Sequence, residues 1–251
     1  MSIHPTAIIE EGAQVGANCT IHAYAVIHRG TELAANVAVH PFAVVGGDPN
    51  FLKFDPATTS GVRVGEGTVI REHASINRSI YAGKDTVVGA RCYLMANAHV
   101  GHDCLVSDDV VLATNVMLGG HSEVGAFTFF GGGAGAHQFS RIGEGVMIAG
   151  LSRITQDLAP FLLVAERNEV SGLNLVGLKR RGFSREAIGE IKDCFHEVFA
   201  EGDPRKRAAA RLATGVRTAE AKRFLEFFAG GKRGFARPHG HAGVTATESE
   251  G

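Results

Sequence analysis

Histidines and an aspartate gather in one short stretch, residues 97–104, which reads Asn-Ala-His-Val-Gly-His-Asp-Cys. His99 and His102 are three residues apart, and Asp103 directly follows His102. A histidine can accept a proton near neutral pH because its ordinary pKa is about 6.5, and a neighbouring carboxylate can orient the ring and stabilise the imidazolium. We therefore interpret His102 as a candidate general base and Asp103 as its partner.

A six-residue repeat runs through the chain on both sides of this stretch. Aliphatic side chains recur at nearly every sixth position from Ile3 to Val45, and again from Val64 to Ile154. A period of six matches neither an amphipathic helix, with its period of about 3.6, nor a two-sided strand. It is typical of short strands joined by tight turns, in which three strands close a triangular coil and successive coils stack in parallel. The predicted fold class is mainly β, and 24 repeat positions predict eight coils.

Two places interrupt the repeat. Between Pro49 and Gly61 the periodicity is lost, and the sequences Asp-Pro-Asn at 48–50 and Asp-Pro at 55–56 indicate a loop. One later repeat position falls on Ala82, inside Tyr-Ala-Gly-Lys-Asp, which we interpret as a small bulge or turn.

Stacking of the coils converts sequence spacing into geometry. His102, His121 and His137 fall in repeats that begin eighteen residues apart, so they are expected on the same part of three consecutive coils. His99 ends the repeat before His102, at the same corner. The sequence therefore predicts four histidines along one edge of the prism.

Zinc binding is the alternative chemistry for such an edge. Stacked histidines on a β-helix edge resemble the zinc site of the γ-class carbonic anhydrases, whose histidine pattern needs a third ligand five residues after the second. The position five residues after His137 is Ile142, which the repeat places inside the prism. We therefore expect no metal site and no cofactor.

Composition excludes several classes of partner. The 25 basic and 26 acidic residues nearly cancel, so no global field draws the chain toward nucleic acid or an anionic membrane. The N-terminus lacks a signal-peptide pattern, and no apolar run reaches the roughly 18 residues of a transmembrane helix. The cysteines have neither disulfide-framework nor zinc spacing; they are Cys19, Cys92, Cys104 and Cys194. We expect a cytoplasmic protein.

Helical signals replace the repeat near residue 173. Ser184 is the expected N-cap of a helix over residues 185–200, and Asp203 with Pro204 begins a second helix. Thr218 is the expected cap of a last helix that runs through residue 228.

These signals divide the chain into three parts. Residues 1–172 form the β-helix, with a loop insertion near 49–61, and residues 173–237 form a small α-helical C-terminal domain. Residues 238–251 are rich in Gly, His, Thr and Glu, a composition typical of a disordered tail.

Four stretches carry a resemblance to a known family. They are residues 97–104, Gly119-Gly120-His121, Ala136-His137-Gln138-Phe139, and residues 177–185, which read Gly-Leu-Lys-Arg-Arg-Gly-Phe-Ser-Arg. With the repeat and the helical region, they resemble the UDP-N-acetylglucosamine O-acyltransferases, the first enzymes of lipid A biosynthesis. The repeat resembles the left-handed parallel β-helix of the wider hexapeptide acyltransferases, and its handedness is inferred from that resemblance alone.

The resemblance implies catalytic roles for three residues. His102 matches the general base that takes a proton from the sugar 3-hydroxyl as it attacks the thioester of a 3-hydroxyacyl chain on acyl carrier protein. Asp103 matches the partner of that base. Gly120 matches the residue whose backbone N–H holds the developing oxyanion, a role that needs close approach and no side chain.

Further positions match residues that line the family's substrate site. The sugar and cleft positions are His99, His121, His137, Gln138 and Asn77, with Lys53 as a basic residue from the loop. The nucleotide and phosphate positions are Asn174, Arg180 and Arg181, where the guanidinium fork suits a diphosphate. The acyl-groove positions are Ala149 and Gly150, whose small size leaves room for a long chain.

Three departures from the family pattern concern the sugar. Phe51, Asn77 and Val176 stand where the family usually has aspartate, histidine and glutamate, and about one coil near the N-terminus is missing. Each lost polar group could change which hydroxyl the site recognises. The acceptor is therefore either UDP-N-acetylglucosamine or a close relative such as a 3-amino UDP-sugar, which would give an amide.

Two other functions remain as alternatives: a metal-dependent hydratase on the same fold, and a non-catalytic module that binds a sugar nucleotide or a carrier protein. The resemblance also implies a homotrimer with sites between neighbouring prisms, and a basic surface for the acidic acyl carrier protein. The candidates for that surface are Lys179, Arg180, Arg181, Arg185, Arg205, Lys206 and Arg207.

Overall fold

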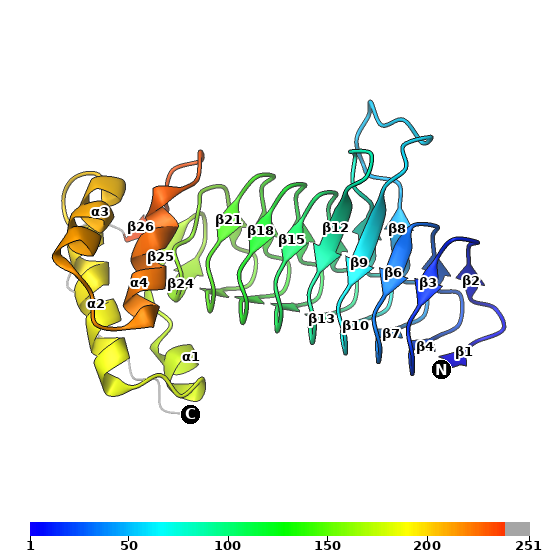
Figure 1. Cartoon of the computed structure of the whole chain (residues 1–251), viewed down its shortest axis with the longest axis horizontal. Helices are drawn as coiled ribbons and strands as arrows, with labels where there is room; N and C mark the ends of the chain where they lie inside the picture. Colours follow the sequence, from blue (N-terminus) through cyan, green and yellow to red (C-terminus); the bar gives the residue numbers. More distant parts are fainter. Residues whose placement is uncertain (239–251) are drawn as a thin grey trace.

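Two-residue strands separated by four-residue turns occupy most of the first 154 residues. A computed structural model gives the fold over residues 1–238, which are the residues described below. The strands stack into three parallel sheets, A, B and C, which form the sides of an elongated prism (Figure 1). The predicted parallel β-helix of hexapeptide repeats, followed by helices, is confirmed.

Each sheet takes every third strand of the chain. Sheet A contains β1 (Ser2–Ile3), β4 (Thr20–Ile21), β7 (Ala38–Val39), β10 (Val69–Ile70), β13 (Tyr93–Leu94), β16 (Val111–Leu112), β19 (Phe129–Phe130) and β22 (Met147–Ile148). Sheet B contains β2 (Ile8–Ile9), β5 (Val26–Ile27), β8 (Val44–Gly47), β11 (Ser75–Asn77), β14 (His99–Val100), β17 (Met117–Leu118), β20 (Gly135–Ala136) and β23 (Arg153–Ile154). Sheet C contains β3 (Gln14–Val15), β6 (Thr31–Leu33), β9 (Gly61–Val64), β12 (Asp85–Val88), β15 (Leu105–Val106), β18 (Glu123–Val124) and β21 (Arg141–Ile142).

The repeat fixes which side chains are buried. In the two-residue strands the second side chain points into the prism, as Val100 and Leu118 do, and both are fully buried. Small residues at the corners, such as Ala98 and Cys104, are buried too and leave room for the aliphatic stack. Burial of one such aliphatic side chain contributes about 1.5–3 kcal/mol, so this column of side chains holds the coils together.

Each turn near the centre of the prism places one residue in the left-handed backbone region. Asn97, Asp103, Asp109, Asn115 and His121 have φ values of 58–62°. Asn and Asp adopt this conformation more readily than most residues because their short polar side chains tolerate it. The sharp change of direction allows neighbours in the sequence to project side chains to the same side of an edge.

The prediction of eight complete coils was wrong by one strand. Ala82 lies in a loop, so residues 1–154 contain 23 strands, β1–β23, and sheet C has seven strands where sheets A and B each contribute eight to the prism. Strand partners across this point are 24 residues apart, as Val69 and Tyr93 are. Beyond it the spacing is 18, as between Met117 and Gly135. Six residues have therefore left the coil.

Two loops project from the edge between sheets B and C, which we call the B–C edge (Figure 1). Residues 48–60 connect β8 to β9, and residues 78–84 connect β11 to β12. Arg78 ties them together: its guanidinium pairs with Asp48 at 2.9 Å and donates to the carbonyl oxygens of Pro56, at 2.9 Å, and Thr58. Only 6% of Arg78 is exposed, so its bonds to the longer loop replace contacts with water.

An antiparallel hairpin and a group of helices end the described chain (Figure 1). The hairpin was not predicted; it consists of β24 (Leu162–Ala165) and β25 (Glu169–Leu173) and continues sheet A. The helices are α1 (Leu175–Arg180), α2 (Arg185–Phe199), α3 (Pro204–Thr214) and α4 (Ala219–Glu226), followed by the 3-10 turn η1 (Phe227–Ala229).

The predicted helix caps are confirmed. Ser184, Asp203 and Thr218 each accept a hydrogen bond from a backbone N–H of the first turn of α2, α3 and α4 respectively. Aromatic side chains then join the helices, for example Phe224 and Phe228, whose ring centroids are 5.5 Å apart.

The chain after the helices returns to the hairpin. The short strand β26 (Arg237–Pro238) pairs with β25, so Pro238, which was assigned to the tail, belongs to sheet A. The rest of that tail, residues 239–251, lies outside the described residues. The four cysteines are buried and free. Of the helices that the structure describes, none has both the length and the apolar character needed to cross a membrane.

Candidate active site

Three of the four predicted histidines, His102, His121 and His137, lie in successive turns of the B–C edge, whereas His99 lies in strand β14 of sheet B. His102 lies in the turn after β14 and His121 in the turn after β17, with their ring centroids 5.0 Å apart and nearly perpendicular. His137 lies in the next turn and is exposed. Both projecting loops leave the prism from this same edge. The repeat thus brings the histidines and the loops together.

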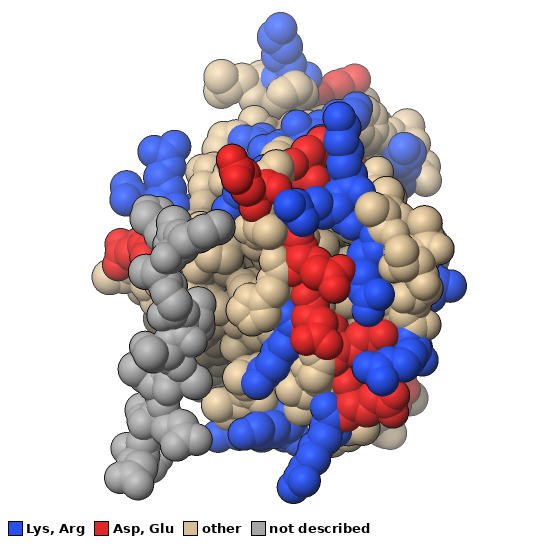
Figure 2. All heavy atoms as spheres, turned by 90° about the vertical axis from the view of Figure 1, so that its left-hand side faces the viewer, with Lys and Arg blue, Asp and Glu red and all other residues tan. Residues whose placement is uncertain are grey.

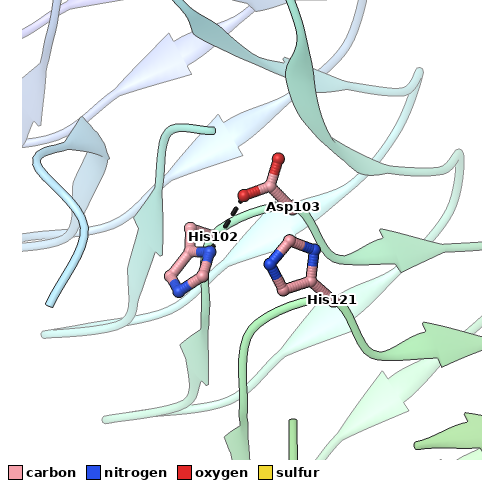
Figure 3. A group of neighbouring side chains, drawn as sticks. All are labelled: His102, Asp103 and His121. Atoms are coloured by element: carbon pink, nitrogen blue, oxygen red, sulfur yellow. Dashed lines mark hydrogen bonds and ion pairs between the residues drawn. The ribbon is translucent and has the colours of Figure 1, made fainter. Parts of the chain in front are cut away.

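His102 and Asp103 interact although they are adjacent in the sequence. Nδ1 of His102 lies 2.9 Å from Oδ2 of Asp103, and the two side chains are 13% and 9% exposed (Figure 3). The left-handed φ of Asp103, 60°, turns its carboxylate back toward the preceding ring. The backbone N–H of Asp103 also donates to Oγ1 of Thr86, at 2.8 Å, which holds the turn.

The loop of residues 78–84 holds the carboxylate of Asp103 from its other side. Oγ of Ser79 donates to Oδ1 at 2.5 Å, and the backbone N–H of Ile80 donates to Oδ2 at 3.2 Å. Burial raises the pKa of Asp103, but the bonds from Ser79, His102 and Ile80 outweigh it and leave the pKa below its ordinary value. Asp103 is therefore a carboxylate near neutral pH, able to accept a hydrogen bond from the Nδ1–H of His102.

Sequence reasoning missed Ser79. The sequence did indicate a bulge or turn where the repeat position falls on Ala82. It did not indicate which residues the extra segment would contact. The structure shows that the six extra residues form the loop that reaches Asp103.

Gly120 packs directly on the His102 ring. A Cβ atom at this position would lie 2.6 Å from both Cε1 and Nε2 of His102, closer than atoms of that kind approach. Only glycine lets the backbone come this near without displacing the ring. Gly120, expected from the resemblance to hold the oxyanion, thus lies in close steric contact with His102.

His99 and His121 flank the pair. Nδ1 of His99 lies 2.8 Å from Oγ of Ser75, and burial, with the nearby His102, lowers the pKa of His99. The ring of His121 stacks on Phe139 with centroids 4.4 Å apart. Burial also lowers the pKa of His121, an effect that the charge of Asp103 opposes. Both rings therefore favour the neutral form more than a free histidine does.

Two grooves flank the B–C edge. The B-side groove, of about 760 Å³, is lined by Asn77, His99, His102, Gly120, His137 and Gln138, among others. The C-side groove, of about 990 Å³, is lined by Tyr81, Lys84, Asp103, His121, Phe139 and Arg233, among others. The edge thus presents His102 to one groove and Asp103 with His121 to the other.

Two of the residues that depart from the family pattern, Phe51 and Asn77, lie at this site. Phe51 lies beside His102, with the two ring centroids 6.2 Å apart. Lys53 is exposed on the same loop and makes no hydrogen bond or ion pair within residues 1–238. Nδ2 of Asn77 donates to the carbonyl oxygen of Asp48 at 2.9 Å, and its buried Oδ1 has no partner among the described residues. Asn77 therefore lines the B-side groove with an amide oxygen that is buried and unpartnered among the described residues.

The predicted nucleotide contacts lie at another edge of the same chain. Asn174 caps α1, accepting from the Gly177 backbone N–H at 2.9 Å, and donates to the Gly145 carbonyl oxygen at 3.0 Å in the turn between sheets C and A. Arg181 lies 3.7 Å from Glu144 and over the ring of Phe127. Arg180, at the end of α1, is exposed.

The acyl-groove candidates lie at the third edge. Ala149 and Gly150 occupy the turn between β22 and β23, which joins sheets A and B. A single chain therefore distributes the predicted site over all three edges of the prism and does not bring these residues to His102.

The structure also contains a trio with metal-ligating atoms that the spacing argument did not consider. One ligand atom from each of His102, Asp103 and His121 lies within 4.8 Å of the others. Ile142, at the position where the alternative pattern needs a ligand, is buried inside the prism. The trio draws on two consecutive coils, whereas the spacing argument considered only the position after His137.

Comparisons with known proteins decide the family. A profile described as UDP-N-acetylglucosamine O-acyltransferase, domain 2, matches residues 157–236, and one described as bacterial transferase hexapeptide matches residues 12–47. The acyl-(acyl-carrier-protein)–UDP-N-acetylglucosamine O-acyltransferase of Anaeromyxobacter sp. is 35% identical over 94% of this chain and 100% of its own. The chain belongs to the UDP-N-acetylglucosamine O-acyltransferase family. The family and the enzyme class predicted from the sequence are thus confirmed.

Other family members agree over the same length. The enzyme of the same name from Campylobacter concisus is 33% identical over 93% of this chain and 96% of its own. Among solved structures, the UDP-N-acetylglucosamine acyltransferase of Campylobacter jejuni aligns with a TM-score of 0.82 and 35% identity, covering 94% of this chain and 99% of that one. The O-acyltransferase of Moraxella catarrhalis aligns with a TM-score of 0.78 and 31% identity, covering 94% and 100%. Both the prism and the helical region lie within this likeness.

Proposed function

We propose that the chain transfers a 3-hydroxyacyl group from acyl carrier protein to the 3-hydroxyl of UDP-N-acetylglucosamine. The observation that carries this proposal is the pair of His102 and Asp103 at the side of a groove, with Gly120 packed on the imidazole. The names of the related enzymes, acyl-(acyl-carrier-protein)–UDP-N-acetylglucosamine O-acyltransferases, supply the donor and the acceptor.

The proposed step is a single acyl transfer with His102 as general base. Asp103 accepts a hydrogen bond from the Nδ1–H of His102, which leaves the lone pair of Nε2 free to take the proton of the sugar hydroxyl. The sugar oxygen then bonds to the thioester carbon, and the backbone N–H of Gly120 donates to the developing oxyanion. The carbon–sulfur bond breaks, and the proton passes from His102 to the departing carrier thiolate. Ser79 keeps Asp103 ionised and correctly oriented throughout.

The distribution of the other site residues supports assembly into a trimer. Asn174 and Arg181 lie at the C–A edge, and Gly150 lies at the A–B edge, away from the His102 turn in the chain. A neighbouring subunit that placed one of these edges against the B–C edge of another would complete the site. The homotrimer inferred from the resemblance provides such an arrangement.

The helical end of the molecule offers the proposed surface for the carrier protein. Figure 2 shows acidic side chains in a band along this face, with basic side chains on both sides of the band. Arg205 donates to the carbonyl oxygen of Gly231, and Arg207 donates to that of Glu201. Some of their N–H groups are therefore already used within the chain. Of the basic residues named as candidates from the sequence, four make no ion pair or side-chain hydrogen bond within residues 1–238: Lys179, Arg180, Arg185 and Lys206. These four are the best candidates to contact an acidic carrier.

A product assay tests the proposal. The purified chain is given a mixture of acyl-carrier donors of different lengths, with either UDP-N-acetylglucosamine or its 3-amino analogue, and products are resolved by mass. We expect an O-acyl ester of UDP-N-acetylglucosamine. An amide formed only on the amino sugar would show that the acceptor is the 3-amino UDP-sugar and not UDP-N-acetylglucosamine. Tight UDP-sugar binding with no acyl product from any donor would indicate a binding module.

A further inference from the structure

Three metal-ligating side chains meet where the two grooves approach each other. His102 and Asp103 lie on one turn of the B–C edge, and His121 lies on the next turn along it. One ligand atom from each falls within 4.8 Å of the others. Figure 3 shows Nδ1 of His102 facing Asp103 and a nitrogen of His121 facing the same space. Small side-chain rotations would bring these three atoms around a single cation.

The donor set suits a divalent transition-metal cation such as Zn²⁺. Two imidazole nitrogens and one carboxylate oxygen, with a further position open, are typical of zinc sites that retain a water or another ligand. The C-side groove, lined by Asp103 and His121, provides that open position. A hard cation such as Mg²⁺ prefers oxygen ligands, so this set disfavours it.

The ligands are already supported from behind, as metal ligands usually are. Ser79 and the backbone N–H of Ile80 orient the carboxylate of Asp103, and Phe139 stacks flat on His121 with an interplanar angle of 5°. Such supporting contacts raise metal affinity because less freedom is lost on binding. Lys84 lines the same groove, and its positive charge opposes a cation there.

We propose that His102, Asp103 and His121 form an inhibitory site for Zn²⁺ or a similar divalent cation. The cation binds the lone pair of Nδ1 of His102, so the single N–H proton of the neutral ring moves from Nδ1 to Nε2. Nε2 then has no lone pair with which to accept the sugar proton. Metal binding itself is independent of the proposed function, whereas the inhibition rests on His102 acting as the general base.

Metal binding is tested without substrate. The chelator-treated full chain is titrated with Zn²⁺ by calorimetry and with Co²⁺ by visible absorption. We expect one ion per chain and the intense bands of four-coordinate Co²⁺. His121→Ala removes a ligand and should weaken binding on the order of tenfold to a hundredfold or more, whereas Lys84→Ala should strengthen it. His137→Ala is the matched control, because His137 lies on the same edge outside the trio. Equal affinity in wild type and His121→Ala would overturn the site.

Inhibition is tested separately in the acyl-transfer assay. Zinc at the concentration that saturates the calorimetric site should suppress kcat, and a chelator should restore it. Saturated enzyme with unchanged kcat would overturn the tautomer argument. If the chain shows no turnover with any donor, the proposed function fails, while the calorimetric and Co²⁺ titrations still decide whether the cation site exists.

Discussion

Nδ1 of His102 lies 2.9 Å from Oδ2 of Asp103 because Asp103 occupies the left-handed backbone region at the corner of a coil. On a straight strand, adjacent side chains point to opposite faces. The turn removes this obstacle, and the next coil then supplies Gly120 against the same imidazole. An imidazole, an orienting carboxylate and a closely packed glycine backbone thus follow from the geometry of a tight turn.

Ser79→Ala should reduce kcat on the order of tenfold while leaving KM nearly unchanged, because Ser79 positions Asp103 without lining the B-side groove. The substitution removes a bond that lowers the pKa of Asp103, so this pKa should rise. Asp103 would then become protonated at a higher pH, and the acidic limb of the kcat profile should move upward. Ser107→Ala, at an exposed turn, is the control. An unchanged pH profile would contradict the role of Ser79.

Gly120→Ala should reduce kcat/KM by a factor of about 100 or more, because the new Cβ would displace the His102 ring and the backbone N–H beside it. Gly189→Ala in α2 is a matched control, since its Cβ would meet nothing within 4 Å. The control should keep full activity and gain about 0.5–1 kcal/mol of stability from helix propensity. Full activity in Gly120→Ala would show that the contact is unimportant.

Arg78→Met should release the loop of residues 48–60, because this buried arginine bonds Asp48, Pro56 and Thr58. Amide hydrogen exchange within residues 50–57 should accelerate, and KM for the sugar nucleotide should rise because Phe51 no longer rests beside His102. Arg63→Met, whose side chain pairs with Asp85 on the exposed face of sheet C, provides the comparison. Equal exchange in the two variants would argue against the clamp.

Glu190→Gln should destabilise the helical region by about 1.5–3 kcal/mol at neutral pH, since the buried carboxylate accepts bonds from Thr218 and the Arg217 backbone. Burial raises the pKa of Glu190, but these bonds outweigh it and hold the pKa at about 2, against an ordinary value of 4.5. The stabilisation is complete above about 4.5 and is lost as the pH falls toward 2. Denaturant unfolding of both proteins across this range should therefore converge in acid.

The sequence predicted the fold where one rule applied throughout. The six-residue period placed Val100 and Leu118 in the core and aligned His102 with His121, because stacking makes spacing equivalent to position. The helix caps Ser184 and Asp203 followed from equally local chemistry. These features depend on neighbours along the chain or on a constant repeat.

The features that the sequence did not predict depend on which distant residues the loops and the short helix α1 contact. Ala82 is a residue type that the repeat accepts, yet it lies in the loop between β11 and β12. This loop places Ser79 within hydrogen-bond distance of Asp103. The role of Asn174 as a cap bonded to Gly145 required knowing which edge α1 meets. Neither outcome is encoded in a period or a propensity, because both are set by contacts between distant segments.

The most direct test of the account is the turnover of His102→Ala with acyl carrier donor and UDP-N-acetylglucosamine, measured beside its circular dichroism and its oligomeric mass. Because His102 is exposed to a groove and is not part of the aliphatic stack, the fold and the assembly should match the wild type. We expect kcat to fall by about 100-fold to 10,000-fold. A correctly folded His102→Ala protein with near-normal kcat would contradict the assignment of His102 as the general base.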